Sequence, residues 1–507
     1  MKKLPILVLF ALAFVAGVLT TTPAAQAGLF GGSKGTPTPS PVPSALPTAS
    51  PEPAEVAIPR LMAKLKANPN DELAMTQLAA EYLQLGRPDV TLQYTQHLLQ
   101  MGDKSAQVFY YDGFAEEQLG NAVVATYDME QAANLDPTNL GILAQLADIY
   151  IKESRFSDAE RVAKRAVTFN KTDGTALMTL GSVYAAEQHF DDARAQFEAA
   201  LLLNPKDTAP LFQIATTYAQ QDNIPMALQT VQRALAINPR DVQALVFKAD
   251  LYARQHDDAH ASEAYDDAVV AAPTDGAKVA IMARKAGYFS TEKKDAQANA
   301  IFQQIISTFP KVATGFVAYG DYLASQHQFA QAATQWQAAL ALEPDNAGAL
   351  MGLGEAALQG GRTDQAIAYF KHYTQISPDA QGYALLGQAY TRVRDYSGAR
   401  NACGKSFEIQ RSPDTLSCVG GADYELKNYK EAASIFDALD RAAKGFLESN
   451  PQYLYIAAKS YAASNQCAKA VATYKRLLPM MKKGTSEYDK VSKAASGSCP
   501  ASAKHSG

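Results

Sequence analysis

The 507-residue chain has one Trp, four Cys and little net charge, and the small net charge and the missing motifs exclude several classes of function. Its 46 Lys and Arg face 51 Asp and Glu, which gives a net charge of −5. The chain lacks the excess of positive charge with which a protein neutralises a phosphate backbone, so nucleic acid is not an expected partner. No CxxC spacing, Gly-rich phosphate loop or Ser or Cys nucleophile motif occurs. We therefore expect no enzyme, no cofactor and no small-molecule substrate.

The N-terminus has the pattern of an export signal. Lys2 and Lys3 precede an apolar run from Leu4 to Leu19, and Ala25-Gln26-Ala27 supplies the small residues expected before a cleavage point. We expect a signal peptide over residues 1–27, no lipid attachment because no Cys follows it, and a periplasmic, extracellular or envelope-associated protein. The alternative is an uncleaved membrane anchor, although a bilayer span needs about 20 apolar residues.

A Pro-rich stretch follows the signal, with seven prolines between Pro37 and Pro53 and few large apolar side chains. Such a composition cannot bury a core, so residues 28–57 are predicted to be a disordered linker. The stretch is either a spacer or a leader without a role.

The four cysteines, Cys403, Cys418, Cys467 and Cys499, lie in the last quarter of the chain. An even number in an exported protein indicates disulfides, and four cysteines allow three pairings. We favour Cys403 with Cys418 and Cys467 with Cys499, because each pair is close in sequence.

Small residues recur at a nearly constant interval beyond residue 70. They are Ala79, Gly113, Ala147, Gly181, Ala215, Ala249, Ala286, Gly320, Gly354, Gly387, Gly420 and Ala458. Five steps of 34 residues are followed by steps of 37, 34, 34, 33, 33 and 38. A second series keeps step twelve residues later: Ala125, Ala159, Ala193, Ala227, Ala261, Ala298, Ala332, Ala366, Ala399, Ala432 and Ala470. Two series that change their spacing together indicate a tandem repeat.

The spacing predicts a hairpin of two helices, because a small residue on each helix lets the backbones approach closely. An aromatic residue such as Tyr184 often follows the first small site by three, where we expect it to fill the gap beside that site. A bulky residue such as Phe197 follows the second small site by four, and a proline such as Pro205 ends the unit.

Residues 176–205, ALMTLGSVYAAEQHFDDARAQFEAALLLNP, closely resemble the tetratricopeptide repeat. The matching residues are Leu177, Leu180, Gly181, Tyr184, Ala193, Phe197, Ala200 and Pro205. The resemblance implies an all-α fold, a right-handed α-solenoid of about twelve helical hairpins over residues 58–479. We expect capping helices at 54–67 and 485–495, with residues 480–507 forming the C-terminal cap and tail. We expect the extra residues of the 37- and 38-residue steps to lie in loops between units. The first unit is irregular in another way, because Thr91 stands where alanine is expected.

In this family the first helix of each unit lines a concave groove. The residues of this chain at the family's groove positions are Tyr110, Phe114, Asp148, Met178, Phe212, Val246, Asp250, Val317, Asp321, Met351 and Glu355. The Lys, Asn and Arg that grip a C-terminal carboxylate in some members are not found at these positions. Apolar patches with scattered carboxylates suit an amphipathic or basic segment of a partner protein. The alternative is that some of these apolar residues belong to the core.

Two histidines, His256 and His260, have the spacing of metal ligands on one helix. The repeat places them around a turn between helices and no third ligand follows from the sequence, so we expect no metal site. The sequence thus predicts a non-catalytic scaffold or assembly factor of a bacterial envelope. The alternative is a structural component of a secretion, pilus or polysaccharide-export apparatus.

Overall fold

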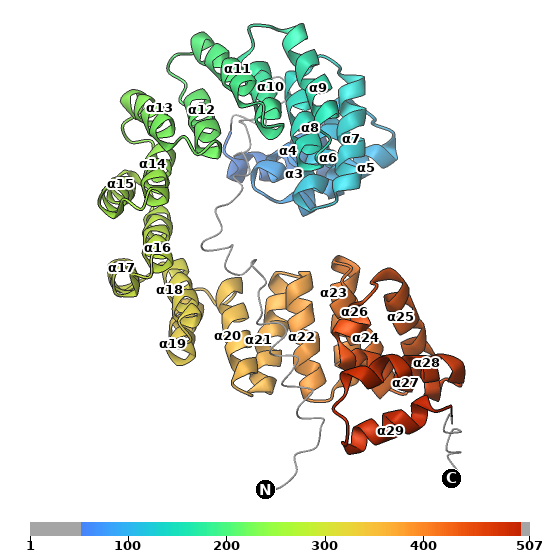
Figure 1. Cartoon of the computed structure of the whole chain (residues 1–507). Helices are drawn as coiled ribbons and strands as arrows, with labels where there is room; N and C mark the ends of the chain where they lie inside the picture. Colours follow the sequence, from blue (N-terminus) through green and yellow to red (C-terminus); the bar gives the residue numbers. More distant parts are fainter. Residues whose placement is uncertain (1–51, 498–507) are drawn as a thin grey trace. The chain divides into compact units, whose positions relative to one another are not determined.

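The computed structural model describes residues 52–497, which fold into helices and no strands (Figure 1). The predicted signal peptide, most of the predicted linker and Cys499 lie outside these residues. Within 52–497, no helix combines the length and the apolar character that a membrane crossing requires. The chain forms two units, here called the N-terminal unit (described residues 52–272) and the C-terminal unit (described residues 273–497).

The N-terminal unit is a series of helical hairpins. Its helices are α3 (Ala54–Ala67), α4 (Glu72–Gln84), α5 (Pro88–Met101), α6 (Ala106–Gln118), α7 (Ala122–Leu135), α8 (Leu140–Lys152), α9 (Phe156–Phe169), α10 (Gly174–Ala186), α11 (Phe190–Leu203), α12 (Ala209–Gln220), α13 (Ile224–Ile237), α14 (Val242–Arg254) and α15 (Asp258–Ala271).

The C-terminal unit repeats the pattern. Its helices are α16 (Asp275–Thr291), α17 (Asp295–Thr308), α18 (Ala313–Ser325), α19 (Phe329–Leu342), α20 (Ala347–Gln359), α21 (Thr363–Ile376), α22 (Ala380–Arg392), α23 (Tyr396–Ile409), α24 (Pro413–Glu425), α25 (Tyr429–Ala442), α26 (Phe446–Ser449), α27 (Pro451–Ala463), α28 (Cys467–Leu477) and α29 (Ser486–Ala495), with a 3-10 turn at Leu478–Met480.

Short polar residues begin many of the first helices. Asp173, for example, accepts a hydrogen bond from the Ala176 backbone N–H, and Asn346 accepts one from Ala349. These bonds satisfy amide groups that have no partner inside the helix. The turn within a hairpin often holds one residue of positive φ, such as Gln188, so the chain reverses over a few residues.

The two small-residue series form the contact between the helices of each hairpin. A Cβ atom on Gly181 would lie 2.7 Å from Cδ1 of Phe197 on the second helix. The space beside the first small site is therefore filled by the bulky residue of the second helix. Tyr184, which we expected to fill it, packs beside the same cluster instead.

The structure adds detail at three irregular places in the sequence pattern. Thr91 is fully buried, and its hydroxyl donates to the Ala79 carbonyl oxygen at 3.2 Å, which lets a threonine occupy the alanine site. The step of 37 residues is accommodated by a longer helix, because α16 has 17 residues. The prediction that the extra residues of this step form a loop is therefore wrong. The predicted linker ended at residue 57, yet α3 begins at Ala54 and buries Ala57.

Candidate binding groove

The eleven predicted groove residues lie on the first helices of their hairpins, α6, α8, α10, α12, α14, α18 and α20. Each comes three residues before or one residue after a small site, so within a unit they occupy matching positions on successive first helices. Ten of the eleven are half-buried and Tyr110 is buried.

The apolar groove residues of the N-terminal unit are partly used in packing. Tyr110 is 3% exposed, and its ring lies 6.1 Å from that of Phe114, so Tyr110 belongs to the core. Phe212 on α12 contacts Phe247 on α14, with ring centroids 5.0 Å apart. Phe247 is half-buried and was missed, because it lies one residue beyond the position that defined the set.

Asp148 forms an ion pair with Lys152, one turn further along α8, at 2.6 Å. The Lys152 ammonium also contacts Glu117 of α6 at 2.5 Å, and the Gln145 amide donates to the other Glu117 oxygen at 2.6 Å. The predicted lone carboxylate is therefore part of a polar cluster that joins two successive first helices.

Asp250 on α14 accepts a hydrogen bond from the Tyr265 hydroxyl at 2.6 Å. Tyr265 is the buried bulky residue of the second helix, α15. This carboxylate thus holds together the two helices of its own hairpin.

Asp321 on α18 makes the equivalent bond in the C-terminal unit. It accepts from the indole N–H of Trp336, the only tryptophan, at 2.9 Å. The ring lies against two glycines, since a Cβ atom on Gly320 or Gly352 would come within 2.7 Å of it. Burial raises the pKa of Asp321 to about 6, and the bond from Trp336 opposes this shift.

Glu355 lies one repeat after Asp321, on α20. Burial raises the pKa of Glu355 above its ordinary value, and the nearby Asp321 carboxylate raises it further. Val317 and Met351, three residues before the small sites of α18 and α20, are half-buried. The C-terminal unit thus presents two electrostatically coupled carboxylates beside apolar side chains.

Two further residues at the predicted groove positions were missed, although the small-residue series includes Ala458. Tyr455 lies three residues before Ala458 and Lys459 lies one residue after it, which are the spacings of the predicted set. Both are on α27 and half-buried. Both positions follow from Ala458, so the expectation that these positions hold no Lys is wrong at Lys459.

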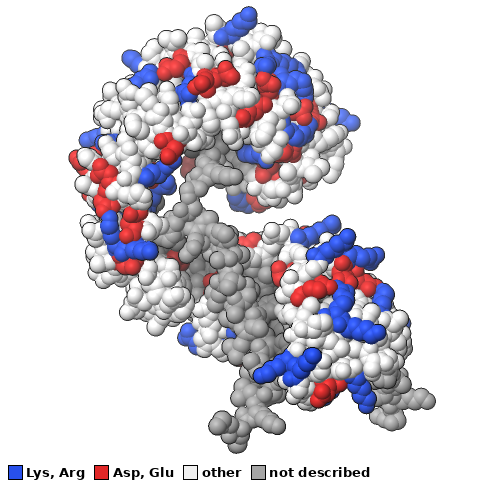
Figure 2. All heavy atoms as spheres, viewed as in Figure 1, with Lys and Arg blue, Asp and Glu red and all other residues white. Residues whose placement is uncertain are grey.

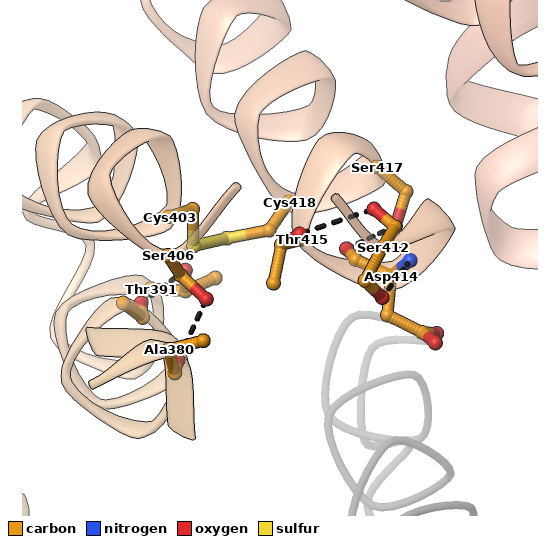
Figure 3. Close-up of a disulfide and its surroundings, with 10 residues drawn as sticks. Ala380, Thr391, Cys403, Ser406, Ser412, Asp414, Thr415, Ser417 and Cys418 are labelled. Atoms are coloured by element: carbon orange, nitrogen blue, oxygen red, sulfur yellow. Dashed lines mark hydrogen bonds between the residues drawn. A yellow bond between two sulfur atoms is a disulfide. The ribbon is translucent and has the colours of Figure 1, made fainter. Parts of the chain in front are cut away.

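A disulfide joins α23 and α24 through Cys403 and Cys418, the first predicted pair (Figure 3). Their Cα atoms are 6.0 Å apart. Next to it, the Ser406 hydroxyl donates to the Ala380 carbonyl oxygen of α22 at 2.7 Å, so three successive helices are tied together (Figure 3). The pairing of Cys467 with Cys499 stays a prediction, because Cys499 lies outside the described residues.

His256 has a positive φ in the turn before α15, and His260 lies in the first turn of that helix. The His260 ring contacts Asp257 at 2.7 Å. Among residues 52–497, no group of three or more His, Cys, Asp or Glu side chains is arranged to hold a metal ion.

Comparisons with known families find two matches. The model described as "Tetratricopeptide repeat" matches residues 317–381, from α18 into α22. The model described as "Tetratricopeptide repeat protein 21 C-terminal ARM domain" matches residues 93–244, from α5 into α14. A comparison with curated proteins gives no significant match.

Many solved structures are similar to parts of the chain. TTC0263, a thermophilic TPR protein of Thermus thermophilus, is 22% identical, with a TM-score of 0.32, over 36% of this chain and 98% of its own. YrrB, described as a TPR protein with an unusual peptide-binding site, is 22% identical, with a TM-score of 0.30, over 36% and 95%. MamA is 18% identical, with a TM-score of 0.27, over 33% and 91%.

Proposed function

Since the chain carries tetratricopeptide repeats, which stack into extended binding surfaces, we propose that it is a non-catalytic scaffold or assembly factor of a bacterial envelope. It holds a segment of a partner polypeptide along the first helices of its hairpins. The envelope location is supported by the basic, apolar and small-residue pattern of residues 1–27.

One observation carries this proposal. Within the N-terminal unit, half-buried apolar side chains recur three residues before the small site of successive first helices, at Met178, Phe212 and Val246. Side chains at the same register form a stripe rather than isolated spots, and partly exposed apolar stripes are typical of binding surfaces. An amphipathic segment matches such a stripe, because its apolar face contacts these residues while its polar face stays in water.

The coupled carboxylates favour a partner that also carries positive charge. Asp321 and Glu355 both have raised pKa values, so each is costly to ionise alone. A Lys or Arg side chain placed beside them would stabilise their ionised forms. The partner segment is therefore expected to be basic where it passes α18 and α20.

Site-specific crosslinking tests the proposal in the native envelope. A photo-crosslinking amino acid replaces Met178 on α10 in one variant and the exposed Gln229 on α13, a second helix, in a matched control. We expect one discrete crosslinked protein from position 178 and none from position 229. Crosslinks from position 229 alone would contradict a groove function.

A second candidate function is that of a structural component of a larger apparatus, which binds its neighbours through the second helices of its hairpins. One exposed apolar patch favours this function. On α7, Val123, Val124 and Tyr127 are 85%, 44% and 57% exposed. The equivalent positions on α9 hold Ser157, Asp158 and Arg161. Exposed apolar residues where the next repeat has polar ones indicate an additional contact surface. If the double variant Val123→Ser, Tyr127→Ser releases the crosslinked partner, this second candidate replaces the first.

A further inference from the structure

The excess positive charge of the C-terminal unit is confined to its last residues. Residues 52–272 carry 31 Asp and Glu against 17 Lys and Arg, whereas residues 273–466 carry 18 of each kind. Residues 467–497, here called the basic segment, carry seven Lys and Arg against two Asp and Glu. The basic segment includes α28 and α29. Figure 2 shows more basic than acidic side chains on the viewed face over α23–α29.

The basic segment is a packed part of the C-terminal unit. Leu477 on α28 and Val491 on α29 belong to one buried cluster. The connection between these helices starts with the 3-10 turn at Leu478–Met480, and the half-buried Met481 that follows packs against the same cluster. The cations of the basic segment therefore project from a folded surface.

Two of the seven cations are held by carboxylates of earlier helices. The Arg476 guanidinium donates to both carboxylate oxygens of Asp440 on α25, each at 2.7 Å, and also pairs with Glu448 on α26. The Lys469 ammonium pairs with Asp437 on α25. These bonds fix α28 to the preceding helices and neutralise the two cations.

Other lysines of the basic segment have no such partner. Within residues 52–497, no ion pair with Asp or Glu is formed by the exposed Lys475, Lys482, Lys483 and Lys490. A single exposed lysine needs no counter-ion, because water solvates it well. Three of the four, however, lie within the nine residues from Lys475 to Lys483. Like charges this close repel one another, and an anionic surface would relieve that repulsion.

An exposed apolar turn lies between these lysines. Residues 477–481 read LLPMM, and within them Pro479 is exposed and Met480 is 42% exposed. The unbranched methionine side chain adapts readily to an irregular apolar environment. Exposed apolar side chains flanked by lysines match the boundary of an anionic bilayer, because the headgroups attract the cations and the acyl region receives the apolar side chains.

We propose that the basic segment binds the surface of an anionic phospholipid bilayer. The ammonium groups of Lys475, Lys482 and Lys483 contact the lipid phosphates, and Met480 enters the boundary between headgroups and acyl chains. The exposed Met480 favours a bilayer over a soluble acidic polymer, which has no apolar layer to receive it. The inference goes beyond the proposed function, because it requires no polypeptide in the groove.

The N-terminal unit does not share this attraction. Its excess of acidic residues means that an anionic surface repels it, so the attraction comes from the basic segment. The groove of the N-terminal unit is then not needed for lipid binding and stays available to a partner polypeptide.

Vesicle co-sedimentation of the full mature chain tests this inference. The probes are vesicles of phosphatidylcholine alone and vesicles of phosphatidylcholine and phosphatidylglycerol in equal parts. Wild type should bind the mixed vesicles and not the neutral ones, and added salt should weaken this binding by screening the charges. The double variant Lys482→Gln, Lys483→Gln should bind the mixed vesicles at least about ten-fold more weakly.

Two further variants make the result specific. The control Lys427→Gln, Lys430→Gln removes two exposed lysines of the same unit outside the basic segment, and it should bind like wild type. Met480→Ser keeps every charge and should still weaken binding to the mixed vesicles.

Failure of wild type to bind the mixed vesicles, or full binding by the Lys482, Lys483 double variant, would overturn the inference. Capture of soluble polyglutamate by wild type without any vesicle binding would overturn it in favour of an acidic polymer. The crosslink from position 178 measures the groove function separately, so either proposal can fail while the other stands.

Discussion

The indole N–H of Trp336 donates a 2.9 Å hydrogen bond to the carboxylate of Asp321, fifteen residues earlier in the chain. Tyr265 makes the matching bond to Asp250 over the same separation. In both cases the bulky residue of the second helix reaches the carboxylate that follows the small site of the first helix. In these two hairpins, the carboxylate that was predicted to face a ligand stabilises the contact between its own two helices.

The single tryptophan makes this bond measurable. Because burial raises the pKa of Asp321 to about 6, the fluorescence of Trp336 should change with pH with a midpoint near 6. Asp321→Asn should abolish the transition, because an amide does not titrate. Asp364→Asn, which changes an exposed carboxylate on α21, should leave it in place. A transition that persists in Asp321→Asn would assign the pH effect to another group.

Gly354, the first small site of α20, lies directly against the ring of Phe370. A Cβ atom on Gly354 would come 2.7 Å from Cδ1 of Phe370, whereas one on Gly404 would meet no atom within 4 Å. Gly354→Ala should lower the free energy of unfolding by about 1–3 kcal/mol through overpacking. Gly404→Ala, within α23, should raise it by up to about 1 kcal/mol because alanine favours helix.

Chemical denaturation of the two alanine variants measures both changes with the same substitution. Equal effects at the two positions would mean that the ring of Phe370 does not constrain Gly354. That outcome would place the repeat register of the C-terminal unit in doubt.

The helical hairpins could be predicted because the small residues that allow close packing recur along the chain. Gly181 and Ala193 identify both helices of a hairpin from their spacing alone. The spacing does not identify the partners of polar groups. Asp250 and Asp321 were expected to offer free charge to a ligand, but each is bonded to an aromatic residue of the next helix.

Part of what was missed lies in the longer steps of the repeat. The step of 38 residues to Ala458 holds the short helix α26, which was not expected there. The series still reaches Ala458, so the position of Lys459 one residue later could have been read from the sequence. The length of α16 reflects helix-forming residues in an insertion that had been expected to be a loop.

The disulfide should stabilise the C-terminal unit. Cys403 and Cys418 close a loop with a sequence separation of 15, and closing a loop of about 15 residues contributes about 3 kcal/mol by reducing the entropy of the unfolded chain. The double variant Cys403→Ser, Cys418→Ser should lose about that amount in denaturation experiments. Mass spectrometry of unreduced peptides should recover the Cys403–Cys418 link, and finding these two thiols free would exclude it.

Three buried carboxylates in the N-terminal unit should make its stability depend on pH. Asp112 and Glu116 on α6 and Asp128 on α7 are 4%, 7% and 4% exposed. The Thr95 hydroxyl of α5 donates to Asp112, and the Asn121 amide donates to Glu116 at 2.6 Å. Within the described chain, Oδ2 of Asp128 is buried and has no hydrogen-bond partner. Burial, then Asp112 and finally Glu116 raise the pKa of Asp128 to about 7.

A carboxyl group with a raised pKa binds a proton more tightly in the folded state than in the unfolded one. Its contribution to stability is therefore complete below about pH 4, the pKa of an unfolded Asp, and is lost as the pH rises to about 7. The free energy of unfolding should fall by up to about 1.4 kcal/mol per pH unit in this window. Asp128→Asn should remove the slope, so that the variant is more stable than wild type at pH 7.5 and similar to it at pH 4.

Asp158→Asn is the matched control for Asp128, because hydrogen bonds from Arg161 and Arg155 lower the pKa of Asp158. A lowered pKa affects stability only as the pH falls below about 4, so this variant should keep the wild-type slope between pH 4 and 7. Urea denaturation at several pH values, followed by circular dichroism, measures all three proteins. A slope that survives in Asp128→Asn would assign the pH dependence to a group other than Asp128 and overturn this interpretation.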